Sequence, residues 1–340
     1  MTRRGGLALL LCLGLAAGAC TSPGPTTSPS STASGSGATL TPGPGTPSPT
    51  LSPSPSPSIS PTASPSPTIT STPGGELLVL RTLPYAHASA ADCGLRTSEC
   101  MQYVDVFAPT AGGPYPVAVM LHGRPRRPKD MEPLAMLIAA RGAVVFNIDY
   151  RGVRPVVQQG WPDAPEDIAC AMRYARANAA KYGGDPSTLV MVGHSYGGYL
   201  GPLVALAGDE FDGDCLHGTE VSALPTGFVG IAGNYVVVRE PIWDTWYGGT
   251  PDEEPAAWQM GNFHTHIGAN PTLRVRIIHE RGDPIIPPNQ PREFHRALID
   301  AGYDSEMTIL DGEEHFALLD PADNGRLVVP MILELLGIPE

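Results

Sequence analysis

The sequence contains few basic residues. Its 340 residues include 21 Lys and Arg against 34 Asp and Glu, which gives a formal net charge of −13 at pH 7, and the basic residues form no cluster. Proteins that bind nucleic acids or anionic lipid surfaces use clustered cations to do so. The composition therefore argues against both kinds of surface as partners and predicts no nucleic-acid binding.

Charged residues of either sign are absent from residues 21–75, which consist almost wholly of Pro, Ser, Thr and Gly. Such a segment cannot bury enough apolar surface to offset the entropy that it would lose on ordering. We therefore predict a disordered linker over 21–75, extended by its prolines. The remaining residues, 76–340, have the size of one ordinary folded domain.

The N-terminus lacks an apolar run long enough to span a bilayer comfortably. Two arginines precede a short run from Leu7 to Ala17, and small residues then lead to Cys20. This order is typical of an export signal. Residues 1–20 also resemble a bacterial lipoprotein signal, which implies a lipid anchor at Cys20 on the extracellular face of the bacterial cell membrane. The alternative is an ordinary secretory signal, which would leave the chain secreted.

The cysteines show no CxxC pair and no Cys/His spacing, so they do not favour a metal site. Cys12 and Cys20 belong to the signal, and an even number remains in an exported domain, which predicts disulfides. Four cysteines permit three pairings. We favour one bond that closes a short loop and one that ties a helix to a later loop, namely Cys93–Cys100 and Cys170–Cys215.

The folded part alternates short β-rich runs with longer runs of helical period. Several strands, such as VAVML and LVMVG, are apolar throughout, as strands buried on both faces of a parallel sheet must be. The alternation predicts a mostly parallel, doubly wound α/β sheet with functional groups at the carboxyl ends of its strands. We expect eight strands, of which the first two form an antiparallel edge. The candidates are 77–80, 103–107, 117–121, 144–148, 189–192, 227–231, 275–279 and 307–310.

The helix candidates are 131–140, 163–181, 196–207, 289–301 and 325–336. Residues 209–225 and 234–272 fit the alternation poorly and are expected to be small insertions over the active-site end. Their aromatic residues Trp243, Trp246, Tyr247 and Trp258 fit either the wall of an apolar pocket or ordinary core packing.

The strongest local signal is Gly-His-Ser-Tyr-Gly-Gly at 193–198, directly after the strand TLVMV and directly before a helical run. A sharp strand-to-helix turn places its central residue in a strained backbone, and the flanking glycines remove side-chain clashes. Ser195 would then project its hydroxyl from the turn. This context predicts Ser195 as a nucleophile.

A serine hydroxyl needs a neighbouring base at neutral pH. His315 lies in a loop after the last strand candidate and before the last helix, and Asp283 lies between Gly and Pro after the preceding strand. The order Ser…Asp…His favours His315 as general base and Asp283 as the acid that orients it. Glu280 is the alternative acid. A weaker alternative is that His264 and His266 bind a metal ion as a pair.

The segment His-Gly-Arg-Pro at 122–125 follows the strand VAVML, where a second donor to a developing oxyanion should lie. We expect the backbone amides of Arg124 and Tyr196 to form the oxyanion hole. Neither a metal nor an organic cofactor is required. Nearby, Asp149 and Arg151 are expected to form a structural ion pair.

Residues 100–338 resemble the α/β-hydrolase superfamily, nearest to carboxylesterases of the feruloyl-esterase-like and kynurenine-formamidase-like kinds. The resemblance rests on HGRP (122–125), NIDYRG (147–152), the stretch from 167 to 200 with its GHSYGG, YGGTPDE (247–253), HERGDPIIPP (279–288) and GEEHF (312–316). It implies an α/β-hydrolase fold and a serine hydrolase that cleaves small-molecule carboxylic esters through an acyl-enzyme.

One departure from that pattern is His-Gly-Arg-Pro, where relatives often carry His-Gly-Gly-Gly or His-Gly-Gly followed by an aromatic residue. It also resembles the His-Gly-Gly-Pro of prolyl-oligopeptidase-like serine peptidases, so a peptidase is one alternative. A noncatalytic, surface-binding lipoprotein on a hydrolase scaffold is the other.

Overall fold

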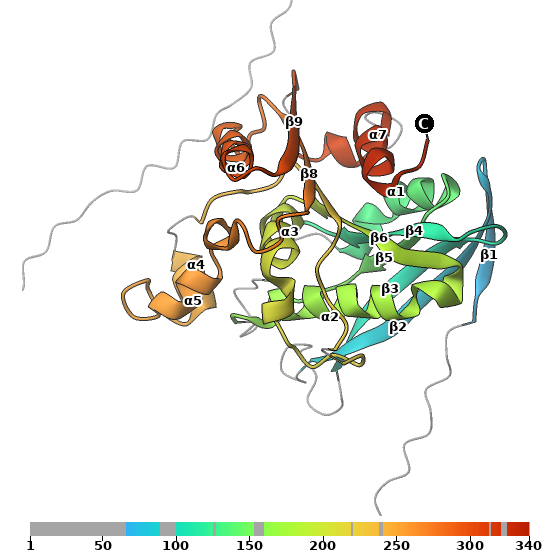
Figure 1. Cartoon of the computed structure of the whole chain (residues 1–340), viewed down its shortest axis with the longest axis horizontal. Coiled ribbons are helices and arrows are strands. Elements are labelled where there is room, and N and C mark those ends of the chain that lie inside the picture. The colour runs from blue at the N-terminus through green and yellow to red at the C-terminus, as the bar shows by residue number, and fades with distance from the viewer. Residues whose placement is uncertain are drawn as a thin grey trace, which may run out of the picture. The chain divides into compact units, whose positions relative to one another are not determined.

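A computed structural model describes residues 66–88, 100–124, 127–152, 160–218, 220–237, 241–312, 314–320 and 325–339. All of them belong to one compact unit, Pro61–Glu340. Within them, nine strands form a single sheet in the order β1-β2-β3-β5-β4-β6-β7-β8-β9 (Figure 1). The strands are β1 Thr68–Thr72, β2 Gly75–Ala88, β3 Cys100–Pro109, β4 Tyr115–Leu121, β5 Val144–Ile148, β6 Gly184–His194, β7 Gly227–Ile231, β8 Arg274–Glu280 and β9 Asp304–Leu310.

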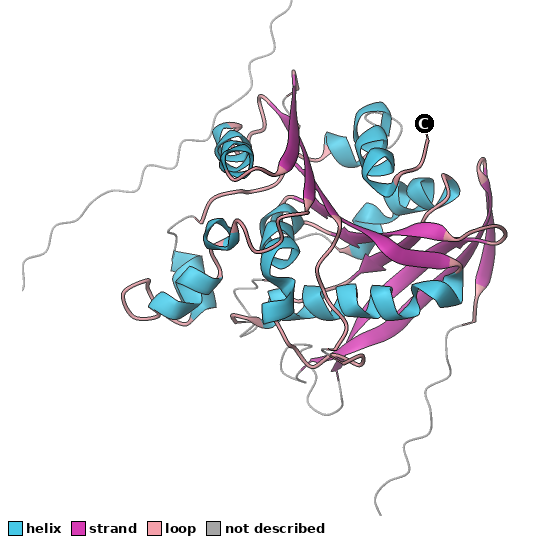
Figure 2. Cartoon of the chain, viewed as in Figure 1, coloured by secondary structure: helices cyan, strands magenta, loops and turns pink. Residues whose placement is uncertain are grey.

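Helices cover both faces of this sheet (Figure 2). The α-helices are α1 Pro128–Ala140, α2 Asp163–Asn178, α3 Tyr196–Ala207, α4 Pro241–Tyr247, α5 Pro255–Met260, α6 Asn289–Asp300 and α7 Gly325–Leu336. Short 3-10 turns are η1 Ala179–Tyr182, η2 Gly208–Glu210, η3 Phe263–His266 and η4 Ala317–Leu319.

The strands from β5 to β9 in the sheet order are parallel, whereas β1, β2 and β3 form an antiparallel edge. The chain passes from β4 to β5 on one side and returns to β6 on the other side of β4. This reversal makes the carboxyl ends of β4 and β6 the switch point of the sheet, which is where doubly wound folds bind their ligands.

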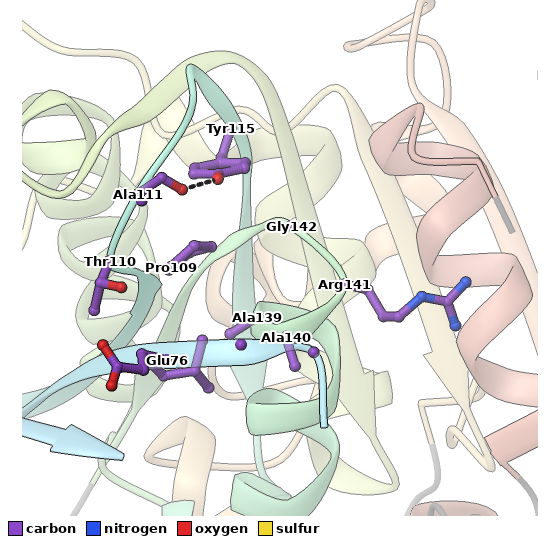
Figure 3. A pocket seen from close by; sticks show the side chains of 12 residues that line it. Glu76, Pro109, Thr110, Ala111, Tyr115, Ala139, Ala140, Arg141 and Gly142 are labelled. Atoms are coloured by element: carbon purple, nitrogen blue, oxygen red, sulfur yellow. Dashed lines mark hydrogen bonds between the residues drawn. The ribbon is translucent and has the colours of Figure 1, made fainter. Parts of the chain in front are cut away.

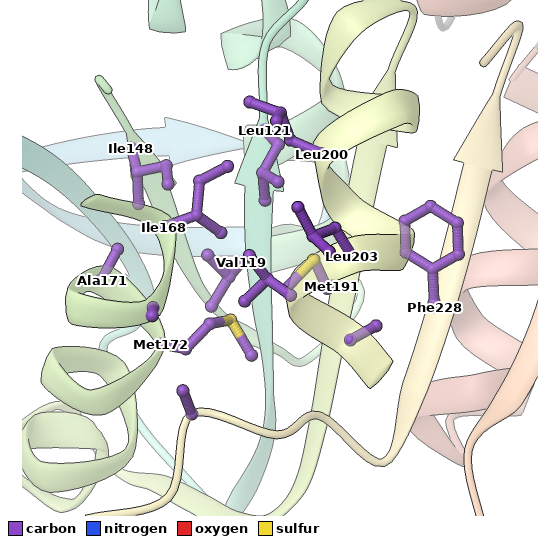
Figure 4. Packing of buried hydrophobic residues seen from close by; sticks show 14 of the residues in the cluster. Val119, Leu121, Ile148, Ile168, Ala171, Met172, Met191, Leu200, Leu203 and Phe228 are labelled. Carbon is purple, nitrogen blue, oxygen red and sulfur yellow. The ribbon is translucent and has the colours of Figure 1, made fainter. Parts of the chain in front are cut away.

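The apolar strands bury side chains on both faces. Val119 and Leu121 of β4 pack with Ile168 of α2 and Leu200 of α3 (Figure 4), whereas the alternate residue Met120 belongs to the cluster that contains α1 and α7. The period of two along a strand explains this division. The parallel pairings confirm the predicted mostly parallel α/β sheet. Continuous apolar runs such as VAVML occur because these strands contribute side chains to a hydrophobic cluster on each face.

The strand count differs from the expected eight. The additional strand, β1, pairs antiparallel with β2 through a tight turn and lies within the segment 21–75 that the sequence predicts to be linker. Its residues Thr68–Thr72 are β-branched in part but mostly exposed, and they show no apolar alternation. An edge strand with no buried side chain shows no alternation of apolar and polar residues, so its composition alone assigns it to the linker.

The two expected insertions occupy different places. Residues 234–272 follow β7 and so begin at the edge of the sheet where Ser195 lies, and they carry α4, α5 and η3. Residues 209–225 instead pack along α2, where Arg173 donates hydrogen bonds to the carbonyls of Phe211 at 2.6 Å and Val221 at 3.1 Å. The first insertion is therefore bound to a helix rather than placed over the site.

A disulfide joins Cys170 of α2 to Cys215 of this insertion, with the two Cα atoms 5.1 Å apart, as predicted. Cys100 is also disulfide-bonded, but its expected partner Cys93 lies outside the described residues, as do the signal segment and Cys20. Among the helices that the structure describes, none has both the length and the apolarity needed to cross a membrane.

Candidate active site

Ser195 occupies a sharp turn between β6 and α3. Its backbone has φ 54° and ψ −111°, and its amide donates a hydrogen bond to the carbonyl of Ile231 in β7 at 3.0 Å. A positive φ is uncommon for a residue with a side chain and marks local strain. The sequence therefore predicted the strained turn correctly from its glycines and from the strand and helix on either side.

Glycine is required on both sides of this turn. A Cβ on Gly193 would collide with the carbonyl of Gly197, and one on Gly197 would lie 2.6 Å from the carbonyl of Leu121. Because these contacts are with backbone atoms, they cannot be relieved by moving a side chain. The absence of a side chain lets the start of α3 pack directly on the end of β4.

Three side chains that are distant in the sequence meet at this turn. The Ser195 hydroxyl lies 2.8 Å from Nε2 of His315, and Nδ1 of the same ring lies 2.7 Å from Oδ2 of Asp283. With the ring proton on Nδ1, His315 donates to the carboxylate and accepts from the serine. The side chains of His315 and Asp283 are almost completely buried, so this hydrogen-bonded line is shielded from water.

Asp283 is held by backbone donors as well as by His315. Its Oδ1 accepts hydrogen bonds from the amides of Ile285 at 2.8 Å and Ile286 at 2.9 Å. Burial by itself would raise the pKa of this carboxyl, but the hydrogen bonds from His315 and from the two amides outweigh burial and hold the pKa below its ordinary value. The carboxylate therefore remains ionised throughout the physiological range.

A buried histidine supports the turn that carries Asp283. His279 donates from Nε2 to the carbonyl of Ile286 at 2.8 Å, and the same nitrogen lies 3.6 Å from Oδ2 of Asp283. Burial lowers the pKa of His279. The ring is therefore neutral at physiological pH and contributes no net charge beside the carboxylate.

Glu280, the alternative acid, has another partner. Its carboxylate accepts a hydrogen bond from the backbone amide of Glu314 at 2.5 Å, next to His315. Glu280 thus contacts the loop that bears His315, while Asp283 contacts its ring. Glu280 is the last residue of β8, whereas Asp283 lies in the turn beyond it, between Gly and Pro, as the sequence interpretation expected of the orienting acid.

The loop after β4 lies against the serine. A Cβ on Gly123 would be 3.0 Å from the Cβ of Ser195. Nδ1 of His122 lies 2.9 Å from the Gly123 carbonyl, and the His122 ring stacks on Tyr150 with centroids 4.3 Å apart. The amide of Arg124 belongs to the same peptide group as this carbonyl and points the opposite way, so His122 fixes the direction of that amide.

The two charged residues of NIDYRG do not pair with each other. Arg151 binds Asp167 at 2.8 Å and Asp163 at 2.9 Å, both on α2, while Asp149 lies 3.3 Å from Nε2 of His122. The expected ion pair between Asp149 and Arg151 is therefore wrong. Both residues lie beyond the end of β5 at Ile148, and each charge finds a partner on a separate element.

Aromatic rings continue from the serine into the second insertion. Tyr196 stacks on Trp243 with centroids 6.2 Å apart, and Trp243 meets Trp246 edge to face at 5.4 Å. Tyr247 in turn lies 4.4 Å from Trp258. These rings are all at least nine-tenths buried, which favours the packing interpretation for most of the cluster.

The histidines of the alternative metal pair each contact a backbone carbonyl. Nε2 of His264 lies 3.2 Å from the carbonyl of Tyr235, and Nε2 of His266 lies 2.8 Å from that of Met260. In the part of the chain covered by the structure, no three His, Cys, Asp or Glu side chains are grouped as metal ligands would be. Both imidazoles hold the insertion together.

A separate cavity of about 270 Å³, drawn in Figure 3, lies at the opposite end of β4 from Ser195. It is lined by Tyr115 at the start of β4, by the turn between β1 and β2, and by the end of α1 around Arg141. Since β4 runs from this cavity to the serine, its seven residues separate the two by roughly 20 Å. The cavity takes no part in the arrangement around Ser195.

Comparison with known proteins assigns the chain to a family. The BD-FAE family pattern matches residues 104–298, which is more than half of the chain. Esterase LipC of Mycobacterium tuberculosis (strain ATCC 25618 / H37Rv) is 31% identical over 210 residues, covering 55% of this chain and 49% of LipC. Esterase LipQ of the same organism is 28% identical over 200 residues, covering 52% and 44%. The chain thus spans about half the length of the curated relatives that it matches.

Solved structures share the fold. A truncated carbohydrate esterase from gut microbiota gives a TM-score of 0.62 at 19% identity, covering 76% of this chain and 96% of that one. Butyrate-bound esterase 2 of Thermogutta terrifontis gives 0.56 at 22% identity, covering 69% and 87%. At such identities the likeness establishes the architecture alone.

Proposed function

The chain belongs to the BD-FAE family and has the α/β-hydrolase fold, and from that premise we propose that it hydrolyses carboxylic esters through a Ser–His–Asp triad. The observation that carries the proposal is the hydrogen-bonded line from the Ser195 hydroxyl through His315 to Asp283. The names of LipC and LipQ support an ester as the substrate.

In the first half of the reaction, Ser195 Oγ attacks the ester carbonyl while its proton passes to Nε2 of His315. Asp283 stabilises the imidazolium that forms and holds its tautomer. The negative charge that develops on the carbonyl oxygen is met by the amides of Arg124 and Tyr196. The orientation of the Gly123 peptide by His122, and the position of Tyr196 at the first turn of α3, support these two donors.

The first half ends when His315 gives its proton to the departing alcohol, which leaves the acyl group bonded to Ser195. The second half is the hydrolysis of this acyl-enzyme. Water then attacks this acyl-enzyme as His315 takes a proton from it, and the serine is regenerated when the acid leaves. Side chains and water account for every proton in this route, so it calls for no cofactor.

The direct test is Ser195→Ala assayed with a p-nitrophenyl ester. Since members of a triad act as a unit, kcat should fall on the order of 10⁶-fold. Turnover by this variant at the wild-type rate would end the proposal. The noncatalytic alternative is tested separately, because an active serine in the wild type should be labelled at Ser195 by a fluorophosphonate and an inert one should not.

A panel that compares short esters with proline-containing peptides separates the esterase from the peptidase alternative. We expect kcat/KM for the esters to exceed that for the peptides by orders of magnitude. Because an ester has a better leaving group than an amide, a serine peptidase would also hydrolyse the esters, so cleavage of the peptides is the deciding result. Measurable turnover of the proline-containing peptides would assign the chain to the other class.

We also propose that the chain is exported through residues 1–20 and anchored by a lipid on Cys20. The disulfide between Cys170 and Cys215 supports export, because disulfides persist in oxidising compartments. Metabolic labelling with a fatty acid in a bacterial host should mark the wild type and not Cys20→Ser. Equal labelling of both, or of neither, would contradict the anchor.

A further inference from the structure

His194 precedes the nucleophile and is completely buried, with an exposed fraction of 0%. It ends β6, in which the residues from Leu189 to Val192 are apolar and buried. A buried imidazole costs free energy unless it forms hydrogen bonds. Packing alone therefore does not account for a histidine at this position.

One hydrogen bond of His194 is to the backbone of the base, His315. Nε2 of His194 donates to the backbone carbonyl of His315 at 3.1 Å, across a sequence separation of 121 residues, and the two rings lie 5.2 Å apart between centroids. On its other side, a Cβ on Gly123 would come within 2.8 Å of Nδ1 of His194. One imidazole thus contacts both the loop that carries the base and the loop after β4.

Glu280 holds the same loop at a second point. Glu280 is 5% exposed, and its carboxylate accepts a hydrogen bond from the backbone amide of Glu314 at 2.5 Å. Gly312 leaves the room that this carboxylate fills, because a Cβ there would collide with it. The backbone of residues 314–315 is therefore held at two points. The Glu280 carboxylate accepts from the amide of Glu314, and His194 donates to the carbonyl of His315.

We propose that His194 and Glu280 form a two-point clamp that positions His315, a role that rests on the proposed function of the triad. Neither side chain touches the reacting atoms. The clamp sets the backbone of His315 so that Nε2 stays 2.8 Å from the serine hydroxyl while Nδ1 stays 2.7 Å from Asp283. Fixing the backbone matters because a displacement of about 1 Å in a catalytic group can cost on the order of 10²-fold in rate.

The test compares disruptive with conservative substitutions in the full chain. His194→Leu and Glu280→Leu remove one hydrogen bond each, whereas His194→Gln and Glu280→Gln retain a donor and an acceptor of similar reach. With a p-nitrophenyl ester we expect the leucine variants to lose on the order of 10²-fold in kcat with little change in KM. The glutamine variants should recover most of that loss.

His266→Leu is the matched control, because it removes another imidazole that contacts a backbone carbonyl, at 2.8 Å, within the second insertion. Its kcat should remain near that of the wild type. In proton NMR, the downfield resonance of the His315 Nδ1 proton should shift or broaden in His194→Leu and persist in His194→Gln. Wild-type kcat in a folded His194→Leu would overturn the clamp.

Should His194→Leu fail to fold, His194→Asn and His194→Gln still decide the matter. Both are polar amides, but the shorter Asn cannot reach the His315 carbonyl, so kcat should be lower for Asn than for Gln. Equal kcat values would refute the clamp. Failure of the triad itself is distinguishable, because Ser195→Ala would then leave turnover intact, whereas failure of the clamp leaves a Ser195-dependent esterase.

Discussion

The carboxyl group of Asp283 illustrates how a single residue links folding to pH. Its pKa lies below the ordinary value of about 3.9 because His315 and two backbone amides bind the ionised form despite burial. The folded state therefore binds this proton less tightly than the unfolded state does. The resulting stabilisation is complete above the unfolded pKa and is lost as the pH falls through the folded pKa.

This sign gives a prediction for Asp283→Asn. Between pH 7 and pH 3 the free energy of unfolding of the wild type should fall more steeply than that of the variant, because the variant has no proton to take up at this site. The two slopes should differ below about pH 4. Urea unfolding at a series of pH values measures both slopes. Parallel curves would show that the carboxyl has the same pKa in the folded and unfolded states.

Residues differ in how far their sequence context reveals them. Ser195 and His315 follow from motif and order, and Asp283 from its place between Gly and Pro after a strand. The contacts of His194 and Glu280 with the loop of His315 could not be anticipated, because they depend on which backbone groups come to lie beside them in space. The separate partners of Asp149 and Arg151 escaped prediction for the same reason.

At the scale of elements, the turn that carries Ser195 depends on close contact between α3 and the end of β4. A Cβ on Gly197 would approach the carbonyl of Leu121 to 2.6 Å and that of His122 to 2.9 Å. The first carbonyl belongs to the last residue of β4 and the second to the loop that follows it and leads to Gly123. A methyl group at this position would therefore separate the nucleophile from the adjoining loop.

We expect Gly197→Ala to lose about 1–3 kcal/mol of stability from overpacking and on the order of 10²-fold in kcat from misplacement of Ser195. Gly160→Ala is the control, since the nearest atom to its added Cβ lies 3.8 Å away. Urea unfolding and ester hydrolysis measure the two effects. If Gly197→Ala behaved like Gly160→Ala, the close packing would not be required.

Strands and helices with strong apolar patterns were predictable almost to the residue. The expected 144–148 and 227–231 coincide with β5 and β7, and 196–207 with α3, because each is almost wholly apolar and bounded by turns. The edge strand β1 was missed because its burial is slight. Elements are thus visible in sequence to the degree that they bury apolar surface.

At the scale of the whole molecule, one disulfide and several hydrogen bonds attach the first insertion to helix α2 and to strand β2. The disulfide of Cys170 and Cys215 closes a loop of 45 residues, and Arg173 binds carbonyls within the same segment. In addition, the amide of Leu216 donates to the carbonyl of Tyr85 at 3.0 Å. These noncovalent bonds do not depend on the oxidation state of the cysteines.

The double variant Cys170→Ser/Cys215→Ser should therefore fold with its insertion still attached but with lower stability. Opening a loop of 45 residues costs about 4 kcal/mol through the greater entropy of the unfolded chain. For a domain of this size such a loss lowers the thermal midpoint on the order of 10 °C. Calorimetry of the wild type and the double variant, without reductant so that the bond at Cys100 is kept in both, measures the shift.

Because Ser195, His315 and Asp283 lie on other elements, kcat/KM for an ester at 25 °C should remain near that of the wild type. An unchanged midpoint would show that Arg173 and the backbone hydrogen bonds hold the insertion by themselves, and a large loss of kcat/KM would show that the insertion shapes the site around Ser195.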